Sequence, residues 1–269
     1  MTNNGEKGEF AKYAKGAYHW REYHGSTLSG NVFLKERYNI TLNLLKTLHA
    51  TKTSHVLDVG CGDGALTGLV YHTFHCDVQG IDVTKAGIDL AKEEFAKKKF
   101  CGQFTLVEGY DYSSLSPAQF DFVLCSDVIE HVGQPGRLVE EMWRLVKAGG
   151  YAIVSTPIRL TEKPLSTLHV QEWFPDDFAR FCACRMGKPF VHTMSHPVVF
   201  NELYSIYWSP IGGWIRFIIN VLYGMGINTF SPEATKKWKF PTLQTLVFGP
   251  KEVGTGVERE GQREVPVRR

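Results

Sequence analysis

Three glycines at alternate positions, Gly60, Gly62 and Gly64, mark the first stretch where chemistry could occur. They follow the apolar residues 55–59 and precede residues 65–71, which have the spacing of a helix. Glycine has no Cβ atom, so these positions allow a tight turn and leave bare backbone for a ligand. The N–H groups and positive dipole end of the helix point back at the turn. We therefore expect a small anionic group to bind there.

An acidic residue, Asp82, closes the next predicted strand, 22 residues after Gly60. A carboxylate about 20 residues beyond such a turn can accept hydrogen bonds from both hydroxyls of a ribose. Taken alone, an Asp at a strand end is more often a turn or cap residue. Its register with the glycines favours the ribose role, with Val83 beside it in the same shell.

Titratable side chains gather farther on, where Asp127, Glu130 and His131 follow another apolar strand and His169 comes after the next one. Imidazole titrates near neutral pH, so His131 is the first candidate for a general base. The alternative is that His131, one turn into a short helix, only caps or orients its neighbours.

The glycine spacing separates two nucleotide-binding families. In the dinucleotide fingerprint, Gly-x-Gly-x-x-Gly, the third glycine comes one residue later than it does here. The pattern Asp58-x-Gly60-x-Gly62-x-Gly64 instead resembles motif I of the class I S-adenosylmethionine (SAM)-dependent methyltransferases. Residues 108–112, Glu-Gly-Tyr-Asp-Tyr, and residues 120–132, which end in Val-Ile-Glu-His-Val, resemble later segments of that family. The resemblance covers roughly residues 55–180.

This resemblance implies roles for several residues around SAM. The glycines would lie against its methionine part, and the backbone near Cys125 and Ser126 would flank its methyl group. Asp111 would accept from the adenine amino group, while the N–H of Tyr112 reaches a ring nitrogen. Alternatively, Asp111 only shapes the loop before Ser113. The predicted cofactor-binding residues are Asp58, Gly60, Gly62, Asp82, Val83, Asp111, Tyr112 and Ser126.

Methyl transfer asks for an acceptor held in line and a base that removes its proton. We predict His131 and His169 as the catalytic residues. With Asp127 and Glu130 they resemble the divalent-metal site of the RNA 3′-terminal 2′-O-methyltransferases, in which a Glu stands at the Asp127 position. Relatives without metal carry much the same residues, and a basic RNA-binding face is missing here. We therefore predict no metal site.

Strand and helix patterns alternate along the chain with short connections, which predicts an α/β fold. The expected architecture is a doubly wound, Rossmann-like, seven-stranded and mostly parallel sheet with helices on both faces. Its ligand crevice would lie at the carboxyl ends of the strands. A strand is expected to begin at Tyr151, after a turn at Gly149 and Gly150. The predicted organisation is an N-terminal arm and helix (1–50), a SAM-binding domain (51–197), an apolar insertion (198–240), the last strand (241–251) and a disordered tail (252–269).

Residues 198–230 carry only two charges, Glu202 and Arg216, among many aromatic and aliphatic residues. We expect a break at Ile211-Gly212-Gly213 to divide them. They would form extra core or a dimer contact, a cap over an apolar acceptor, or an amphipathic surface that touches a membrane. In the N-terminal arm, the aromatic cluster between Tyr13 and Tyr23 is either docked on the domain or forms a flap over the cofactor.

Composition sets the remaining bounds. The chain has 269 residues, 43% of them hydrophobic, and a formal charge of +2, so we do not expect nucleic acid as a partner. The six cysteines have no metal-like spacing, the N-terminus is polar and no long apolar run occurs, so we predict a reduced, cytoplasmic protein. We expect it to be a monomer or a homodimer. We predict a transferase that moves a methyl group from SAM to an oxygen, less readily a nitrogen, of a small-molecule, sugar or lipid-type acceptor. The alternatives are the metal-dependent RNA methyltransferase and a SAM-binding protein without catalysis.

Overall fold

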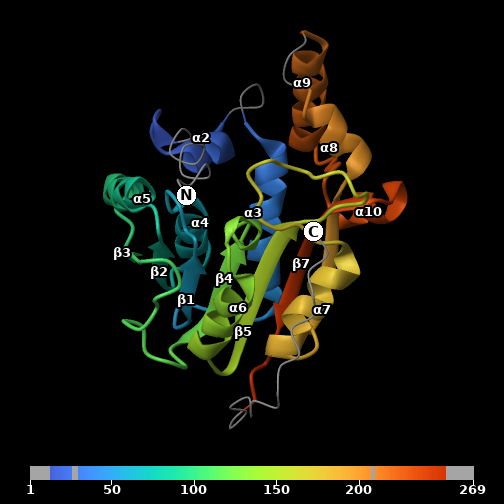
Figure 1. Cartoon of the computed structure of the whole chain (residues 1–269). Coiled ribbons are helices and arrows are strands. Elements are labelled where there is room, and N and C mark those ends of the chain that lie inside the picture. The colour runs from blue at the N-terminus through green and yellow to red at the C-terminus, as the bar shows by residue number, and fades with distance from the viewer. Residues whose placement is uncertain (1–12, 26–29, 207–209, 253–269) are drawn as a thin grey trace.

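The computed structural model describes residues 13–25, 30–206 and 210–252. Within these residues a single seven-stranded sheet has the order β3-β2-β1-β4-β5-β7-β6 (Figure 1). The strands are β1 (His55–Val59), β2 (Asp77–Asp82), β3 (Gln103–Leu106), β4 (Phe120–Ser126), β5 (Val146–Pro157), β6 (Val191–Pro197) and β7 (Pro241–Phe248).

Only β7 runs against its neighbours. It pairs antiparallel with both β5 and β6, whereas the pairs β1·β2, β1·β4, β2·β3 and β4·β5 are parallel. The expected doubly wound, Rossmann-like and mostly parallel sheet is therefore confirmed. Because the carboxyl ends of the parallel strands share one edge, the residues that follow β1, β2, β4 and β5 meet there.

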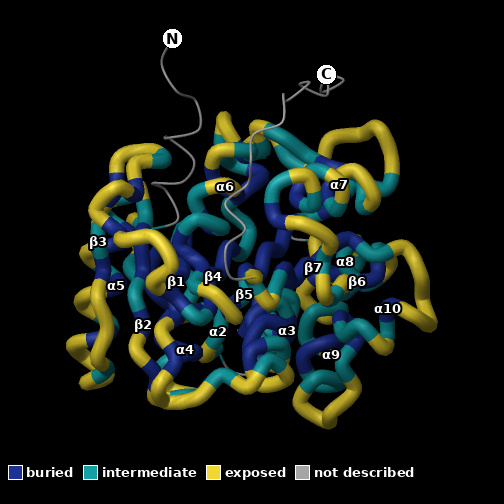
Figure 2. Tube along the Cα trace, turned by 90° about the horizontal axis from the view of Figure 1, so that it is seen from below, coloured by how far each residue is buried: buried dark blue, intermediate teal, exposed yellow. Residues whose placement is uncertain are grey.

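Helices cover both faces of the sheet. One face packs against α2, α3, α4 and α5, and the other against the short helix η1, α6 and α7. Figure 2 shows the strands as a buried layer between these outer elements. The helices are α2 (Tyr18–His24), α3 (Val32–Thr47), α4 (Ala65–Phe74), α5 (Lys85–Lys98), η1 (Ile129–His131), α6 (Pro135–Leu145), α7 (Pro175–Met186), α8 (Val198–Tyr204), α9 (Pro210–Gly224) and α10 (Pro232–Trp238).

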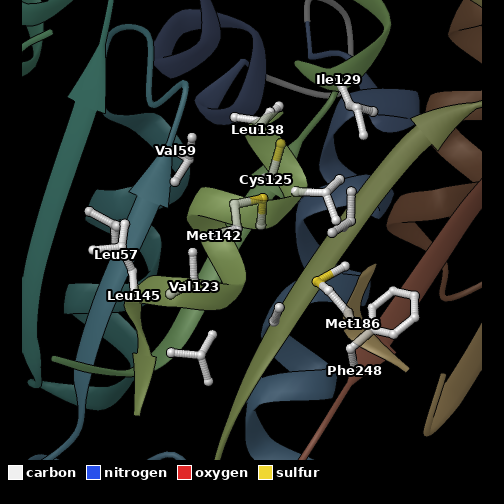
Figure 3. Close-up of a cluster of buried hydrophobic side chains, with 14 of the residues drawn as sticks. Leu57, Val59, Val123, Cys125, Ile129, Leu138, Met142, Leu145, Met186 and Phe248 are labelled. Atoms are coloured by element: carbon white, nitrogen blue, oxygen red, sulfur yellow. The ribbon is translucent and has the colours of Figure 1, made fainter. Parts of the chain in front are cut away.

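The central strand β4 shows why both faces must be covered. Successive side chains of a strand point to opposite faces, and in β4 the apolar residues fill both. Val123 and Cys125 pack towards α6, as Figure 3 shows, whereas Phe122 and Leu124 join the cluster under α3 and α4. All four are at most 4% exposed. A strand that is apolar on both sides is stable only in the middle of such a three-layer arrangement.

The expected turn at Gly149 and Gly150 is wrong. Both residues lie inside β5, whose pairing with β4 is irregular between Phe120 and Phe122. Gly149 donates to the carbonyl of Lys251, and the N–H of Lys251 donates to Gly150. A Cβ atom on Gly150 would lie 2.7 Å from the carbonyl oxygen of Asp121. The glycines therefore permit close approach of neighbouring backbone within a strand.

The expected break near residue 211 lies a few residues earlier, because α8 ends at Tyr204 and α9 begins at Pro210. Ile211, Gly212 and Gly213 themselves form the first turn of α9. A Cβ atom on Gly212 would lie 1.9 Å from the carbonyl oxygen of Ile206. Gly212 thus lets the helix pack on the segment that leaves α8. The insertion between β6 and β7 holds α8, α9 and α10, and its small core is formed by Val32, Tyr204, Ile219 and Phe230.

The tail that was predicted to be disordered (252–269) falls almost entirely outside the described residues, as does part of the N-terminal arm. Among the described residues, no helix is long and apolar enough to span a bilayer. All six cysteines are unpaired, and four of them are buried.

Candidate active site

The turn after β1 has the tight backbone that its glycines predicted, with all three in a conformation that only glycine adopts readily. Gly60, Gly62 and Gly64 have φ values of +74°, +54° and +73°. A Cβ atom at Gly60 would lie 2.3 Å from Val128, in the loop after β4, and one at Gly62 would lie 2.4 Å from the hydroxyl of Tyr13. The turn is therefore bare backbone, closely approached by the β4 loop and by the N-terminal arm.

Asp58 lies beneath this turn. It is 3% exposed, and its Oδ2 atom accepts a 2.6 Å hydrogen bond from the hydroxyl of Thr67 on α4. Burial raises the pKa of Asp58 to about 7; the hydrogen bonds from Thr67 oppose the rise, and the charge of Asp82 adds to it. Asp58 thus fastens the first turn of α4 to β1, so its place in the predicted cofactor shell is behind the turn.

Asp82 closes β2 beside the same turn. Its Oδ2 atom accepts from the N–H of Gly62 at 2.8 Å, and its Oδ1 atom accepts from the N–H of Thr84 at 2.7 Å. An ionised carboxylate has about four acceptor positions, so both oxygens keep capacity for donors such as sugar hydroxyls. The neighbouring Val83 side chain is 58% exposed. These positions fit the predicted ribose contact.

Helix α2 docks on the turn through Asp63, a residue that the sequence analysis missed. The Asp63 carboxylate is fully buried and accepts from the N–H of His19 at 2.7 Å, with the His19 ring nitrogen Nδ1 3.1 Å away. The indole N–H of Trp20 donates to the Asp63 carbonyl at 2.8 Å. The described part of the aromatic arm is therefore docked. The only sequence signal was the acidic residue between two of the glycines.

The loop after β3 gives a mixed picture for the predicted adenine contacts. Asp111 is exposed, and its Oδ1 atom accepts from the N–H of Ser113 at 3.1 Å. Hydrogen bonds from the Ser113 hydroxyl and then from this N–H lower the pKa of Asp111. This is the loop-shaping contact of the alternative interpretation. The Tyr112 side chain is buried in the core, so only its backbone is a candidate for a ligand contact. The adenine roles remain predictions.

Ser126 ends β4 at the centre of the carboxyl edge. Its hydroxyl accepts from Ser155 on β5 at 3.0 Å. The next residue, Asp127, has a φ of +52°, and its carboxylate forms an ion pair with Arg37 from α3. Arg37 was missed by the sequence analysis because nothing in its neighbourhood distinguishes it from a surface arginine. The pair closes the rim on the α3 side, and each partner is only 16% exposed.

Glu130, His131 and His169 come together on the other side of the rim. The Glu130 carboxyl is 1% exposed, and its Oε2 atom accepts from the Thr156 hydroxyl at 3.0 Å. Burial, with the nearby charge of Asp127, raises its pKa. His131 Nδ1 lies 3.2 Å from the carbonyl oxygen of Leu168, and the two imidazole rings have centroids 5.1 Å apart. The structure therefore brings together both predicted catalytic histidines.

Glu172, another residue missed from sequence, orders the loop that carries His169. Its carboxylate accepts from the N–H groups of Leu165 and Ser166 and lies 2.8 Å from His169 Nδ1. Burial raises the pKa of Glu172, but these hydrogen bonds outweigh burial and lower it overall. A carboxylate that accepts from Nδ1 directs the opposite ring nitrogen, Nε2, away from itself. His169 is thus held by its neighbour rather than left to rotate.

The arrangement has the binding groups for two kinds of ligand. The bare glycine turn, the N-terminus of α4 and the Asp82 carboxylate fit an aminoacyl nucleoside. One ligand atom each from Glu130, His131 and His169 lies within 4.8 Å of the others, close enough to share a metal ion. Carboxylate and imidazole are ligands for divalent transition metals. Asp127, the fourth member of the metal set weighed from sequence, is instead neutralised by Arg37.

Comparisons with known proteins find similarity to methyltransferases. A family model for the methyltransferase domain matches residues 57–154. A ubiquinone biosynthesis O-methyltransferase from Thiobacillus denitrificans is 30% identical over 154 residues, which are 57% of this chain and 64% of that protein, slightly less than two thirds of its length.

Two solved structures share the fold. A putative sarcosine dimethylglycine methyltransferase from Galdieria sulphuraria superposes with a TM-score of 0.63 at 11% identity, covering 93% of this chain and 99% of that one. Phosphoethanolamine N-methyltransferase 2 from Haemonchus contortus, in complex with S-adenosyl-L-methionine, gives a TM-score of 0.62 at 14% identity, covering 94% and 60%. At these identities the likeness shows the fold alone.

Replacing Asp58 by Asn should flatten the pH dependence of unfolding. The pKa of Asp58 is about 7 in the folded chain against an ordinary 3.8, so the folded state keeps a proton that the unfolded state releases between these values. Stability from this group is complete below the lower pKa and is lost as pH rises through the upper one. Between about pH 5 and about pH 8 the wild type should lose about 2–3 kcal/mol more than Asp58→Asn in urea unfolding.

Asp89→Asn is the matched control, because Asp89 is 57% exposed on α5. It should retain the pH dependence of the wild type. An Asp58→Asn variant with the wild-type slope would contradict the raised pKa.

Proposed function

We propose that the chain is a class I SAM-dependent methyltransferase that transfers a methyl group to an oxygen of a small-molecule acceptor. The observation that carries the proposal is the meeting of two sets of residues at one edge of the sheet. The glycine turn and Asp82 lie after β1 and β2, and Ser126, His131 and His169 lie after β4 and β5. One set fits the donor, and the other can act on an acceptor.

SAM, when bound, supplies a methyl group that its sulfonium has already made electrophilic. The protein then has to hold the acceptor oxygen in line with that methyl group and take up the acceptor proton. We assign the donor site to Gly60, Gly62, Asp82 and the backbone of Ser126. Val83, Asp111 and Tyr112 extend it towards the nucleoside, and Asp58 supports it from behind.

His131 receives the proton in this proposal. With Nδ1 donating to the Leu168 carbonyl, the neutral imidazole carries its lone pair on Nε2. That atom lies 3.9 Å from Glu130 Oε1, so the Glu130 carboxyl faces the ring nitrogen that accepts the proton. His169, oriented by Glu172, lies beside His131 and positions the acceptor hydroxyl.

The acceptor class follows from the relatives and from the insertion. The curated relatives are named for O-methylation in ubiquinone biosynthesis. From these names we infer that the acceptor of this chain also has a ring hydroxyl and an apolar portion. The insertion, with α9 beyond the carboxyl ends of the strands (Figure 1), lies where it can contact that apolar portion. Oxygen is favoured over nitrogen because the site offers a base for a hydroxyl proton.

Binding of SAM should depend on Asp82. Removing its carboxylate in Asp82→Ala deletes two charge-assisted acceptors for ribose hydroxyls and unfastens Gly62, so the SAM dissociation constant should rise roughly tenfold to a hundredfold. Isothermal titration calorimetry with SAM and S-adenosylhomocysteine measures this change. Asp89→Ala, an exposed residue on α5, is the control and should bind like the wild type. No heat from either compound with the wild-type protein would refute the donor site.

Removal of the proposed base should slow turnover without weakening SAM binding. In His131→Ala, methyl transfer from radiolabelled SAM to catechol or a long-chain alkylcatechol should fall by roughly a hundredfold to ten-thousandfold, the usual contribution of a general base. The SAM dissociation constant should stay within about twofold, because Leu168 and Glu130, which the His131 ring approaches, lie outside the proposed donor site. His72→Ala, exposed on α4, should keep wild-type turnover. Unchanged turnover in His131→Ala would remove this residue from the mechanism.

The cluster of Glu130, His131 and His169 favours a second candidate, methyl transfer assisted by a divalent metal. In that case the metal would bind the acceptor oxygen and lower its pKa, and His131 would be a ligand rather than a base. A metal-dependent enzyme that methylates RNA was also considered from the sequence. The formal charge of +2 does not support RNA as the acceptor.

Chelation separates the two mechanisms. If His131 acts as a base alone, treatment with EDTA leaves turnover of the alkylcatechol unchanged. If turnover disappears and returns with Mg²⁺ or Mn²⁺ but not with buffer, the metal-assisted mechanism replaces the proposed one. A chain that binds SAM yet methylates none of these acceptors under either condition would favour the SAM-binding protein without catalysis.

A further inference from the structure

Helix α9 exposes an apolar stripe. Ile211, Trp214 and Ile218 are 69%, 68% and 53% exposed, and Met225, just beyond the end of the helix, is 70% exposed. Their spacing places them along one side of the helix. At 1.5 Å per residue the stripe is about 20 Å long. Large side chains of this kind are expensive to leave in water, so their alignment indicates a partner surface.

The other side of α9 accounts for its packing on the protein. Ile219 and Asn220 are buried, and the Asn220 amide donates to the carbonyl of Gly30 at 2.9 Å. Arg216 is the only charged residue of α9, and its Nε atom donates to the carbonyl of Tyr204 at 2.7 Å. The guanidinium also lies over the Tyr204 ring, 5.1 Å from its centroid. The charge is therefore turned towards α8, and the exposed stripe has none.

A second exposed patch closes the same insertion at residues 236–240, Lys-Lys-Trp-Lys-Phe. All five residues are exposed, with Trp238 at 50% and Phe240 at 62%. Lys239 and Phe240 have φ values of +58° and +49°, a left-handed conformation that is strained in residues other than glycine. This backbone directs an aromatic ring into solvent at the entry to β7, where burial would have been the ordinary outcome.

Both patches lie at the β6 end of the molecule. Figures 1 and 2 show α8, α9 and α10 gathered there, and Figure 1 shows α9 rising beyond the carboxyl ends of the strands. Trp238 packs edge-on against Phe200 of α8, with ring centroids 5.3 Å apart. The patches thus belong to one packed unit beside the edge that holds the candidate active site.

We propose that the α9 stripe and the patch at residues 236–240 together dock this protein on the surface of an anionic lipid bilayer. Exposed Trp and Phe insert at the boundary between headgroups and acyl chains, and lysines between them attract anionic headgroups. This charge complementarity favours a bilayer over a second copy of the chain, whose matching patch would carry the same three positive charges. No described helix can span a membrane, so the contact is peripheral. This inference extends the proposed function. It depends on that function only in the statement that the acceptor is partly apolar.

Vesicle binding tests the proposal with the full chain. In flotation with phosphatidylcholine vesicles that contain phosphatidylglycerol, the wild type should bind, and with phosphatidylcholine alone it should bind far more weakly. Replacing Lys236, Lys237 and Lys239 by Gln should lower the partition coefficient roughly a hundredfold, about fivefold for each lysine. Replacing Ile211, Trp214 and Ile218 by Gln should lower it at least tenfold, because each apolar group then stays in water.

Matched controls use residues outside the insertion. Lys52, Lys92 and Lys188 are exposed, as are the apolar residues Leu106 and Phe190, and their replacement by Gln should leave vesicle binding unchanged. SAM titration of every variant verifies the fold and keeps this test separate from the methyltransferase proposal. Wild-type protein that ignores anionic vesicles, or either patch variant that binds like the wild type, would overturn the proposal. So would a wild-type dimer in sedimentation velocity that the α9 variant converts to a monomer, because a second copy would then cover the stripe.

Discussion

The site depends on how the turn after β1 is held from two sides. From below, the buried Asp58 carboxyl joins β1 to the first turn of α4 through Thr67. From above, the buried Asp63 carboxylate receives α2 through His19. A turn with three glycines would otherwise sample many conformations, since glycine loses more backbone freedom on folding than any other residue. Two carboxyl groups with fixed partners offset that loss and keep the backbone in place for a ligand.

The rim opposite the turn is divided between two carboxylates in different states. Asp127 is neutralised by Arg37 from α3. Glu130 lies beside Thr156 and His131, and its burial raises its pKa. Two negative carboxylates that lie so close together cannot both be buried at low cost. A cation beside one of them therefore reduces the repulsion that the other experiences. The same division separates the support of the rim, on the α3 side, from the two histidines that can act on an acceptor.

The insertion between β6 and β7 packs on the fold with one side and carries the proposed membrane-docking surface on the other. Its inner side forms a small core with α3, in which the Tyr204 hydroxyl accepts from the N–H of Val32 and donates to the carbonyl of Gly30. Its outer side carries the α9 stripe and the exposed lysines of residues 236–240. An enzyme whose acceptor is partly apolar benefits when the surface that meets the lipid phase lies next to its site. The insertion therefore supports the rim and supplies the proposed docking surface.

The sequence by itself determined the sheet and its class, and it named candidates for the site. Period-two and continuous apolar runs are local signals, and the glycine spacing with Asp82 and the segment ending in His131 predicted the cofactor class. It placed two glycine pairs wrongly: Gly149-Gly150 lies within β5, and Gly212-Gly213 within α9. Gly150 permits a close approach of the Asp121 backbone and Gly212 one of the Ile206 backbone, which a local pattern cannot distinguish from a turn.

Only the tertiary structure decided which polar residues support the site. Arg37 and Asp63 act through partners 90 and 44 residues away, and their types alone are those of ordinary surface residues. It also decided that Asp58 lies behind the turn and that the Tyr112 side chain belongs to the core. The physical reason is that the sequence pattern records which side chains avoid water, whereas hydrogen-bond partners are chosen by the packing of elements far apart in the chain.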